Sequence, residues 1–364
     1  MDKPGRLTIS TNMASDEIDQ PPPVSGEQLF QLRQISGKGY GLVASQSIKR
    51  GTCIIKEVPI IQLGSNASEQ ESEMVLARRL SELSPEKAGI IDELYHDPRK
   101  VDPCLFQDSP LTAIRMAIFH TNSVSMGEAG QYGTGLFPLF SRLNHSCNAN
   151  VHHSFNETIG KETVYAVRQI NKGEELVTSY MPTAWRTKKQ RTDHLQQGWG
   201  FSCACRVCVC PNAANSERRR ERMFNIDQAL AMFDKGFKPS PGLKVPLTAR
   251  QALLVSEEML KLLREDSITD FQLAQVYVVW RMTMRIYTDS ICRYRECGKY
   301  SLKSGNIEKA VGYAKKERLV ELYCVGTETA HLEEDMKGAE YWLAYLLARR
   351  GKTLPKHQKR ATGT

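Results

Sequence analysis

The sequence lacks any long apolar run. No stretch of about 18 consecutive apolar residues occurs among its 364 residues, so we expect no membrane-spanning helix. Residues 1–6 also lack the apolar core of a secretory signal. We therefore expect the protein in the cytosol or the nucleus, where cysteine thiols stay reduced.

A strong charge imbalance is missing as well. The formal net charge is +8 and the isoelectric point is about 8.9. This basicity is too mild to indicate direct binding to nucleic acid. The positive charges cluster in residues 188–191, 218–222 and 356–360, which we interpret as solvated helix faces and a frayed tail.

Cysteine is present, but its distribution is uneven. Four of the ten cysteines lie between Cys203 and Cys210. In a reducing compartment such crowding indicates metal binding rather than disulfide bonds. The hydrophobic content of 41% and the charged content of 25% are typical of a globular protein, and the length allows two domains.

The order of periodic patterns predicts an α+β protein. Residues 1–26 are polar and proline-rich, and we expect a flexible leader there. Short strand-like segments joined by glycine turns follow over residues 30–61 and return over residues 151–180. Between them, apolar residues recur at helical spacing over residues 65–121, which predicts a helical insert with a helix start at Ser84–Pro85.

Beyond about residue 213 the pattern is helical to the end. An apolar helix is expected over residues 276–286, and Ser304–Ala314 resembles the turn and second helix of a tetratricopeptide-type hairpin. Residues 337–344 have a similar character, a glycine followed by an apolar helix. Generic helix packing explains two such partial units equally well, so both interpretations stay open.

A polar cluster interrupts the middle of the chain. The consecutive residues Asn144–Cys147 place amide, imidazole, hydroxyl and thiol groups directly after a mostly apolar run. A core element would not accept this cluster, because buried polar groups need partners. The cluster is therefore expected at a site where polar groups meet a ligand, and an ordinary polar turn is the alternative.

Four stretches in a fixed order resemble the motifs of SET-domain methyltransferases. They are Lys38–Leu42, Asn144–Cys147, Gly173–Tyr180 and Phe201–Cys208. Each is weak alone, but the four in this order, with a helical insert between the first two, are specific. The resemblance covers residues 27–211 and is greatest to the SET- and MYND-domain subfamily and its fungal relatives, although the MYND zinc finger is absent.

The resemblance implies small β-sheets with a helical insert, and a pseudoknot where the Asn144 and Tyr180 segments meet. A post-SET zinc loop and an all-α, tetratricopeptide-like carboxy-terminal domain complete the expected fold. The expected division of the chain is a leader at 1–26, a SET domain at 27–182, a post-SET segment at 183–211 and a helical domain at 212–364.

The implied reaction is methyl transfer from S-adenosylmethionine to an amine. The acceptor must be neutral, because an ammonium has no lone pair, so a lysine has to lose its proton on entering an apolar channel. Tyr180 resembles the catalytic tyrosine of the family, whose hydroxyl orients the methyl group and the nitrogen and stabilises charge in the transition state. A core tyrosine at a strand end is the alternative.

The resemblance also assigns a set of residues to the cofactor. The set is Lys38, Gly39, Tyr40, Asn122, Asn144, His145, Tyr180 and Phe201. The turn at residues 38–40 matches the one that approaches the cofactor carboxylate, and Asn122 matches an asparagine that binds the amino-acid part. Asn144 and His145 match the pair that holds the cofactor, without a role for His145 as a base, and Phe201 matches the ring that stacks on adenine.

Val124 and Trp199 correspond to the substrate channel. Relatives often have phenylalanine at the first position and tyrosine at the second, so the channel wall of this chain differs from theirs. Packing of Trp199 and Phe201 in the core is the alternative.

Three cysteines have the spacing of the post-SET zinc site. Cys203, Cys205 and Cys208 form a Cys-x-Cys-x-x-Cys pattern, and a structural zinc ion takes four ligands in a tetrahedron. By resemblance the fourth ligand is Cys147, and Cys210 is the local alternative. Loss of the ion is expected to loosen the post-SET loop without touching Tyr180, because metal binding orders its ligand loop.

These expectations combine into one function and two alternatives. The sequence predicts a monomeric, S-adenosylmethionine-dependent protein-lysine N-methyltransferase that acts on a histone or another protein and carries zinc. Methylation of a small-molecule amine is the first alternative. The second is a non-catalytic SET scaffold whose helical hairpins hold a partner.

Overall fold

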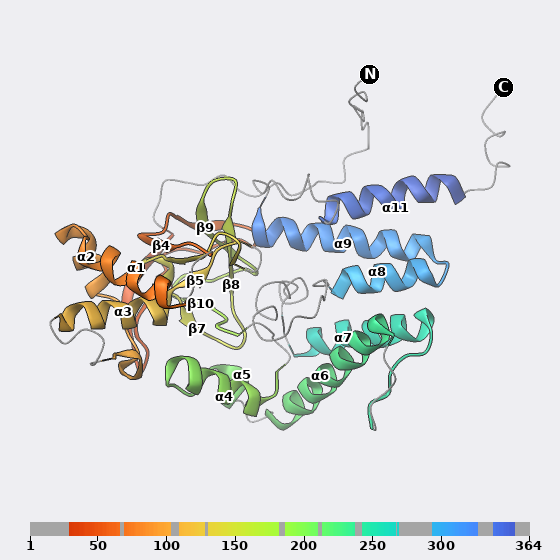
Figure 1. Cartoon of the computed structure of the whole chain (residues 1–364). Coiled ribbons are helices and arrows are strands. Elements are labelled where there is room, and N and C mark those ends of the chain that lie inside the picture. Colours follow the sequence, from red (N-terminus) through yellow and green to blue (C-terminus); the bar gives the residue numbers. More distant parts are fainter. Residues whose placement is uncertain are drawn as a thin grey trace, which may run out of the picture.

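The computed structural model describes residues 29–65, 69–102, 109–127, 130–181, 186–209, 213–236, 242–266, 268, 293–326 and 338–353. The predicted leader, the predicted helix at 276–286 and Cys210 lie outside these residues. Figure 1 shows small sheets at the centre, helices α1, α2 and α3 on one side of them, and helices α6 to α11 on the other. The chain is thus an α+β protein with a helical carboxy-terminal region, as predicted.

Short strands form three sheets. The first has the order β1-β2-β10-β7, the second β3-β9-β8 and the third β4-β6-β5. Their bounds are β1 Phe30–Ile35, β2 Gly39–Ala44, β3 Cys53–Glu57, β4 Ile61–Leu63, β5 Val124–Ser125, β6 Thr134–Leu136, β7 Asn144–His145, β8 Val151–Asn156, β9 Lys161–Ala166 and β10 Glu175–Thr178.

The turn between β1 and β2 depends on glycine. Gly37 and Gly39 have φ angles of 71° and 74°, a left-handed conformation that only glycine adopts without strain. The Lys38 amide closes the turn on the Ile35 carbonyl at 3.0 Å. The turn therefore leaves Lys38 and Tyr40 at the edge of the sheet, as exposed side chains.

Strand β10 divides its pairing between two partners. Its first half pairs antiparallel with β2, where Leu176 faces Leu42. Its second half pairs parallel with β7, where Val177 faces Asn144 and Thr178 faces His145. Because Tyr180 follows β10 by two residues, this pairing brings Tyr180 beside the polar cluster.

The helical insert contains α1 (Glu69–Ser81), α2 (Pro85–Asp92), the short 3-10 helix Pro98–Lys100 and α3 (Pro110–Asn122). The predicted helix start is confirmed, because the Ser84 hydroxyl accepts the Lys87 amide and Pro85 is the first helical residue. Leu76 and Leu80 are fully buried, whereas Met74 is 75% exposed. The spacing of apolar residues therefore predicted the helix α1. It did not predict which of these apolar residues are buried, because Met74 belongs to the same pattern as Leu76 and Leu80.

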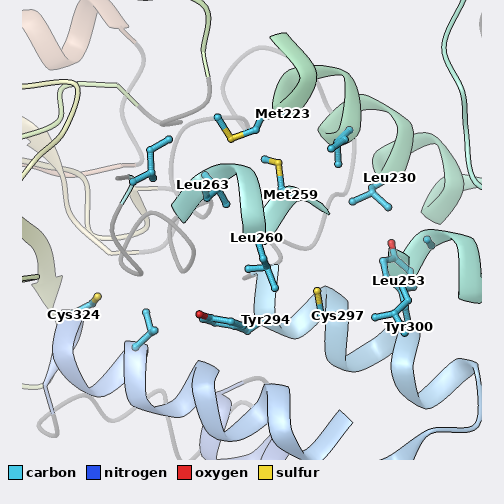
Figure 2. Packing of buried hydrophobic residues seen from close by; sticks show 14 of the residues in the cluster. Met223, Leu230, Leu253, Met259, Leu260, Leu263, Tyr294, Cys297, Tyr300 and Cys324 are labelled. Carbon is cyan, nitrogen blue, oxygen red and sulfur yellow. The ribbon is translucent and has the colours of Figure 1, made fainter. Parts of the chain in front are cut away.

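The carboxy-terminal region is helical. Its helices are α6 Ala213–Lys235, α7 Ala249–Glu265, α8 Arg293–Lys303, α9 Ile307–Val325 and α11 Ala339–Thr353. Figure 2 shows the core shared by α6, α7, α8 and α9, with Met223 of α6, Met259 of α7, Tyr294 of α8 and Cys324 of α9 around one buried cluster.

The predicted turn between α8 and α9 is confirmed. Gly305 has a φ of 84°, and the Asn306 side chain accepts the Lys309 amide at 2.9 Å to cap α9. Helix α9 also contacts β8 and β9, and the Arg50 guanidinium lies 4.5 Å from the Tyr323 ring centre. The helical region is thereby attached to the sheets. The domain boundaries and the tetratricopeptide likeness stay predictions.

No helix within the described ranges is both long enough and apolar enough to cross a membrane.

Glu317 of α9 is a buried acid with an unusual titration. Its carboxylate lies 2.6 Å from Arg295 Nε, and the residue is 5% exposed. Burial raises its pKa from 4.5 to about 7, against the opposing effect of Arg295. Between these two pH values the native state holds a proton that the unfolded state has released.

We therefore expect the free energy of unfolding to fall as the pH rises from about 4.5 to about 7. The decrease attributable to Glu317 should be a few kcal/mol, because one pKa unit corresponds to about 1.4 kcal/mol. Urea unfolding of the wild type and of Glu317→Gln at about pH 5 and about pH 8 measures it. Equal pH dependence in both proteins contradicts the assignment.

Candidate active site

A cavity of about 1730 Å³ lies beside the first sheet. The residues predicted to bind cofactor or line the channel all border it: Lys38, Gly39, Tyr40, Asn122, Val124, Asn144, His145, Tyr180, Trp199 and Phe201. The cavity extends to the carboxy-terminal helices, where α11 contributes Tyr341, Trp342 and Tyr345. Residues that are distant in sequence therefore converge on one space.

Tyr180 is held at both its backbone and its hydroxyl. The backbone N–H donates to His145 Nδ1 at 3.0 Å, and the hydroxyl donates to the Leu143 carbonyl at 2.8 Å. Burial raises the pKa of Tyr180 above its ordinary value of 10.0. The phenol thus stays protonated at neutral pH, and its oxygen keeps lone pairs for a group in the cavity.

Aromatic rings surround Tyr180. Its ring centre lies 5.0 Å from that of Trp199, 5.3 Å from that of His145 and 6.3 Å from that of Phe201. Burial lowers the pKa of His145 from 6.5 to about 4, so the imidazole is neutral at physiological pH. Aromatic faces attract cations and exclude water, so this enclosure suits a positively charged reacting group.

The positions of Trp199 and Phe201 follow from the end of one helix. Helix α4 (Lys188–Trp199) starts with a capping box at Thr187 and ends at Gly200, whose φ is 75°. The Trp199 indole N–H donates to the Thr121 carbonyl at 3.1 Å. This bond ties the end of α4 to the end of α3, across the cavity wall.

Asn144 is fixed by a residue that the sequence analysis missed. Its amide nitrogen donates to Glu175 Oε1 at 2.9 Å and to the Tyr40 carbonyl at 3.3 Å. The other oxygen of Glu175 pairs with Lys38 Nζ at 2.7 Å. Glu175 therefore joins the glycine turn to the polar cluster. Its place in the Gly173–Tyr180 motif was a signal for it.

Asn122 and Val124 lie where α3 runs into β5. The Asn122 amide nitrogen donates to the carbonyls of Ile118 and Tyr95, both at 2.7 Å. These bonds hold the last turn of α3 and direct the chain into the strand. Val124 is half-buried and borders the cavity as the first residue of β5.

Four cysteines meet at the edge of the cavity. The sulfur atoms of Cys147, Cys203, Cys205 and Cys208 all lie within 4.8 Å of one another. Cys147 Sγ is 3.8 Å from Cys203 Sγ and 3.6 Å from Cys208 Sγ. A tetrahedron with zinc–sulfur bonds of about 2.3 Å has sulfur separations of about 3.8 Å, so the cluster fits a structural zinc ion.

Comparison with known protein families matches the SET domain to residues 39–181, the stretch that contains Asn144, His145 and Tyr180. Residues 39–181 are a SET domain. Trp199, Phe201, Cys203 and Cys205 come after residue 181 and still border the cavity, and Cys208 belongs to the cysteine cluster beside it.

Two curated relatives are lysine methyltransferases by name. "Histone-lysine N-methyltransferase set5" of Schizosaccharomyces pombe is 30% identical over 208 residues, 56% of this chain and 59% of that protein. "N-lysine methyltransferase SMYD2" of Rattus norvegicus is 27% identical over 187 residues, 49% of this chain and 40% of that protein. The chain spans less than two thirds of the length of either relative.

The likeness to solved structures is much weaker. A chain of Chaetomium thermophilum Polycomb Repressive Complex 2 bound to GSK126 covers 89% of this chain, with 12% identity, 34% coverage of that chain and a TM-score of 0.24. A score this low carries no argument about the fold.

Two arginines that follow the SET domain in the sequence are buried. The interpretation of the basic clusters as solvated is therefore wrong at these two positions. Arg191 of α4 is 2% exposed, and its guanidinium lies 3.6 Å from Cys208 Sγ. Arg220 of α6 is fully buried and pairs with Asp266 at 2.9 Å. A zinc ion with four thiolates carries a net negative charge, which Arg191 offsets by direct contact.

We expect Arg191→Met to lower the stability of the zinc-loaded protein by about 3 kcal/mol, because it removes the cation from a buried, charged cluster. Urea unfolding measures the loss. Lys189→Met, two positions before Arg191 on the same helix, is the matched control. The Lys189 side chain is 84% exposed, and its surface ion pair with Asp193 is worth about 1 kcal/mol at most. Equal losses in the two variants contradict a role for Arg191 at the cluster.

Proposed function

We propose that the chain is an S-adenosylmethionine-dependent protein-lysine N-methyltransferase. The observation that carries the proposal is the convergence of Tyr180, Asn144 and His145 of the SET domain with Phe201 on one cavity. The names of the curated relatives, which describe lysine methyltransferases, agree with it.

A protein substrate is favoured over a small amine by the size and reach of the cavity. Small-molecule sites typically measure about 300–1,000 Å³, whereas this cavity measures about 1730 Å³ and continues to the aromatic residues of α11. The space accommodates a cofactor and also a stretch of polypeptide that leads a lysine toward Tyr180.

Bound S-adenosylmethionine supplies a methyl group on a sulfonium, which is already activated for transfer to an amine. The remaining task of the protein is placement and exclusion of water. The lysine loses its proton to solvent as it passes the rings of Trp199 and Tyr180, because an apolar wall disfavours the ammonium. The neutral nitrogen would then face the methyl group of the bound cofactor, with Tyr180 and Trp199 lining its path.

Tyr180 orients this reaction and does not act as a base. Its hydroxyl proton is committed to the Leu143 carbonyl, so its oxygen presents lone pairs to the cavity. Those lone pairs attract the positively polarised methyl group and the nitrogen that becomes cationic. The protonated phenol could not remove a lysine proton at neutral pH.

We assign the cofactor contacts by the family resemblance, which the position of these residues on the cavity wall supports. Asn144 and the backbone at His145 hold the amino-acid part with Asn122, and the turn at residues 38–40 approaches the carboxylate. Lys38 acts there through its ion pair with Glu175, and Phe201 stacks on the adenine.

We assign a structural zinc ion to Cys147, Cys203, Cys205 and Cys208. The ion closes the loop that carries Phe201 and Trp199. With four thiolate ligands the ion would have a structural role and no open position for a substrate.

Incubation of the protein with methyl-labelled cofactor and separate cytosolic and nuclear extracts tests the function. We expect label in lysine side chains of one or few polypeptides, identified by mass spectrometry. Label in the protein-free fraction instead supports a small-molecule amine as substrate. Cofactor binding by calorimetry without any transfer supports a non-catalytic scaffold.

A further inference from the structure

His145 lies between the cysteine cluster and Tyr180. Its ring is 4% exposed and makes one contact through each nitrogen. Nδ1 accepts the backbone N–H of Tyr180 at 3.0 Å, and Nε2 lies 3.5 Å from Cys147 Sγ. His145 therefore contacts both Cys147 of the cysteine cluster and Tyr180.

The Tyr180 contact fixes which nitrogen carries the imidazole proton. A backbone N–H can only donate, so Nδ1 must accept and carries no proton. In a neutral imidazole the proton is then on Nε2, the atom that faces Cys147. Nε2–H can therefore donate to the Cys147 sulfur, which is an acceptor when it is a thiolate.

The backbone around His145 leaves little freedom for this arrangement. Thr178 faces His145 in the parallel pairing of β10 with β7, and the Ser146 amide donates to the Thr178 carbonyl at 2.9 Å. The imidazole consequently spans a fixed gap between two segments. A change in the position of Cys147 moves the ring, and the ring moves the backbone of Tyr180.

We propose that His145 is a positioning residue that couples the four-cysteine zinc centre to the backbone of Tyr180. This inference rests on the proposed function, because it treats Tyr180 as the residue that orients methyl transfer. The zinc ion then has two effects: it orders the loop at residues 199–208, and it sets the location of the Tyr180 hydroxyl.

Two substitutions separate the two contacts. The side-chain oxygen of asparagine lies as many bonds from Cβ as Nδ1 does, so His145→Asn retains an acceptor for the Tyr180 N–H. The amide nitrogen of glutamine lies as many bonds from Cβ as Nε2 does, so His145→Gln retains a donor toward Cys147. His145→Ala removes both contacts.

Three of the four readouts do not depend on activity. Cobalt replaces zinc, and the sulfur-to-cobalt charge-transfer band reports hydrogen bonding to the Cys147 thiolate. Release of zinc to a chelator reports metal retention. Hydrogen exchange of the Tyr180 amide, followed by mass spectrometry, reports the bond to Nδ1, and kcat is measured at saturating cofactor.

We expect opposite patterns in the two variants. His145→Asn should shift the cobalt band and release zinc about 10-fold faster, while exchange at Tyr180 stays near that of the wild type. His145→Gln should leave the band and zinc release unchanged, raise exchange at Tyr180 and lower kcat about 10-fold. Zinc removal from the wild type should also raise exchange at Tyr180.

The same patterns in both variants, or a cobalt band that no substitution moves, overturn the proposal. If His145→Gln does not fold, His145→Asn alone still decides, because an unchanged band excludes the Cys147 contact. If the wild type transfers no methyl group, the proposed function fails, but the cobalt and exchange measurements still test the coupling.

Discussion

We expect Tyr180→Phe to lower kcat for methyl transfer at least about 100-fold, the scale of losing one group that stabilises transition-state charge. The cofactor dissociation constant should change little, because the ring still packs against Trp199 and His145. The variant loses the oxygen that faces the methyl group and the amine. Single-turnover kinetics with labelled cofactor measures the rate, and calorimetry measures the affinity.

Tyr300→Phe is the matched control. The Tyr300 hydroxyl is also buried and donates to Asp234 at 2.8 Å, the same length as the Tyr180 bond, but it lies in the core of the helical region. Both variants lose one buried hydrogen bond, at a cost of about 1 kcal/mol in stability. Equal kcat values in the two variants would show that the Tyr180 hydroxyl has no special role.

The second large effect is expected at the metal ligands. Cys147→Ser should lower zinc affinity at least about 100-fold, because it removes one of four thiolates and metal binding is coupled to order in the ligand loop. Cofactor affinity should fall with it, since that loop carries Phe201 next to the cavity. Elemental analysis after dialysis against a chelator gives the zinc content, and calorimetry gives the cofactor affinity.

Cys210→Ser is the control that decides between the two fourth ligands considered for the zinc site. We expect it to keep its zinc, because the sulfur of Cys147 already completes a compact group with Cys203, Cys205 and Cys208. Retention of zinc by Cys147→Ser together with loss from Cys210→Ser would reverse the assignment.

Sequence reasoning located those parts of the fold whose signals are local. The Ser84 cap, the glycine turn before β2 and the turn at Gly305 each depend on a few neighbouring residues, and each appears in the structure. The motifs that carry the family resemblance also fall on the cavity wall. Their order along the chain contained the information needed to place them at one site.

The burial of Arg191 could not be read from the sequence. It stands in the run at residues 188–191, in which every neighbour is polar, and α4 has no pronounced apolar stripe. Contacts from outside the helix, including that of Cys208 Sγ at 3.6 Å, remove Arg191 from water. Burial of this kind is decided by tertiary contacts, while Lys189 on the same helix remains exposed.

Glu175 was missed for a related reason. It follows another acid, Glu174, and the strand pattern alone does not say which of the two meets a partner. Glu175 pairs with Lys38, 137 positions earlier, while Glu174 pairs with Arg168 only six positions away. Glu174 has a partner nearby in the sequence, whereas the partner Lys38 is distant from Glu175, so the motif marked Glu175 without indicating what it contacts.

The divided pairing of β10 has a consequence for the order of folding. Its two edges bind β2 and β7, segments that leave the ribosome long before it. Contacts between such distant segments form slowly, because a large loop must close before they gain stability. A nascent chain that ends before residue 175 therefore leaves β2 and β7 without β10 and lacks Tyr180, which borders the cavity. The wall of the cavity is complete only after both β10 and α11 have been made.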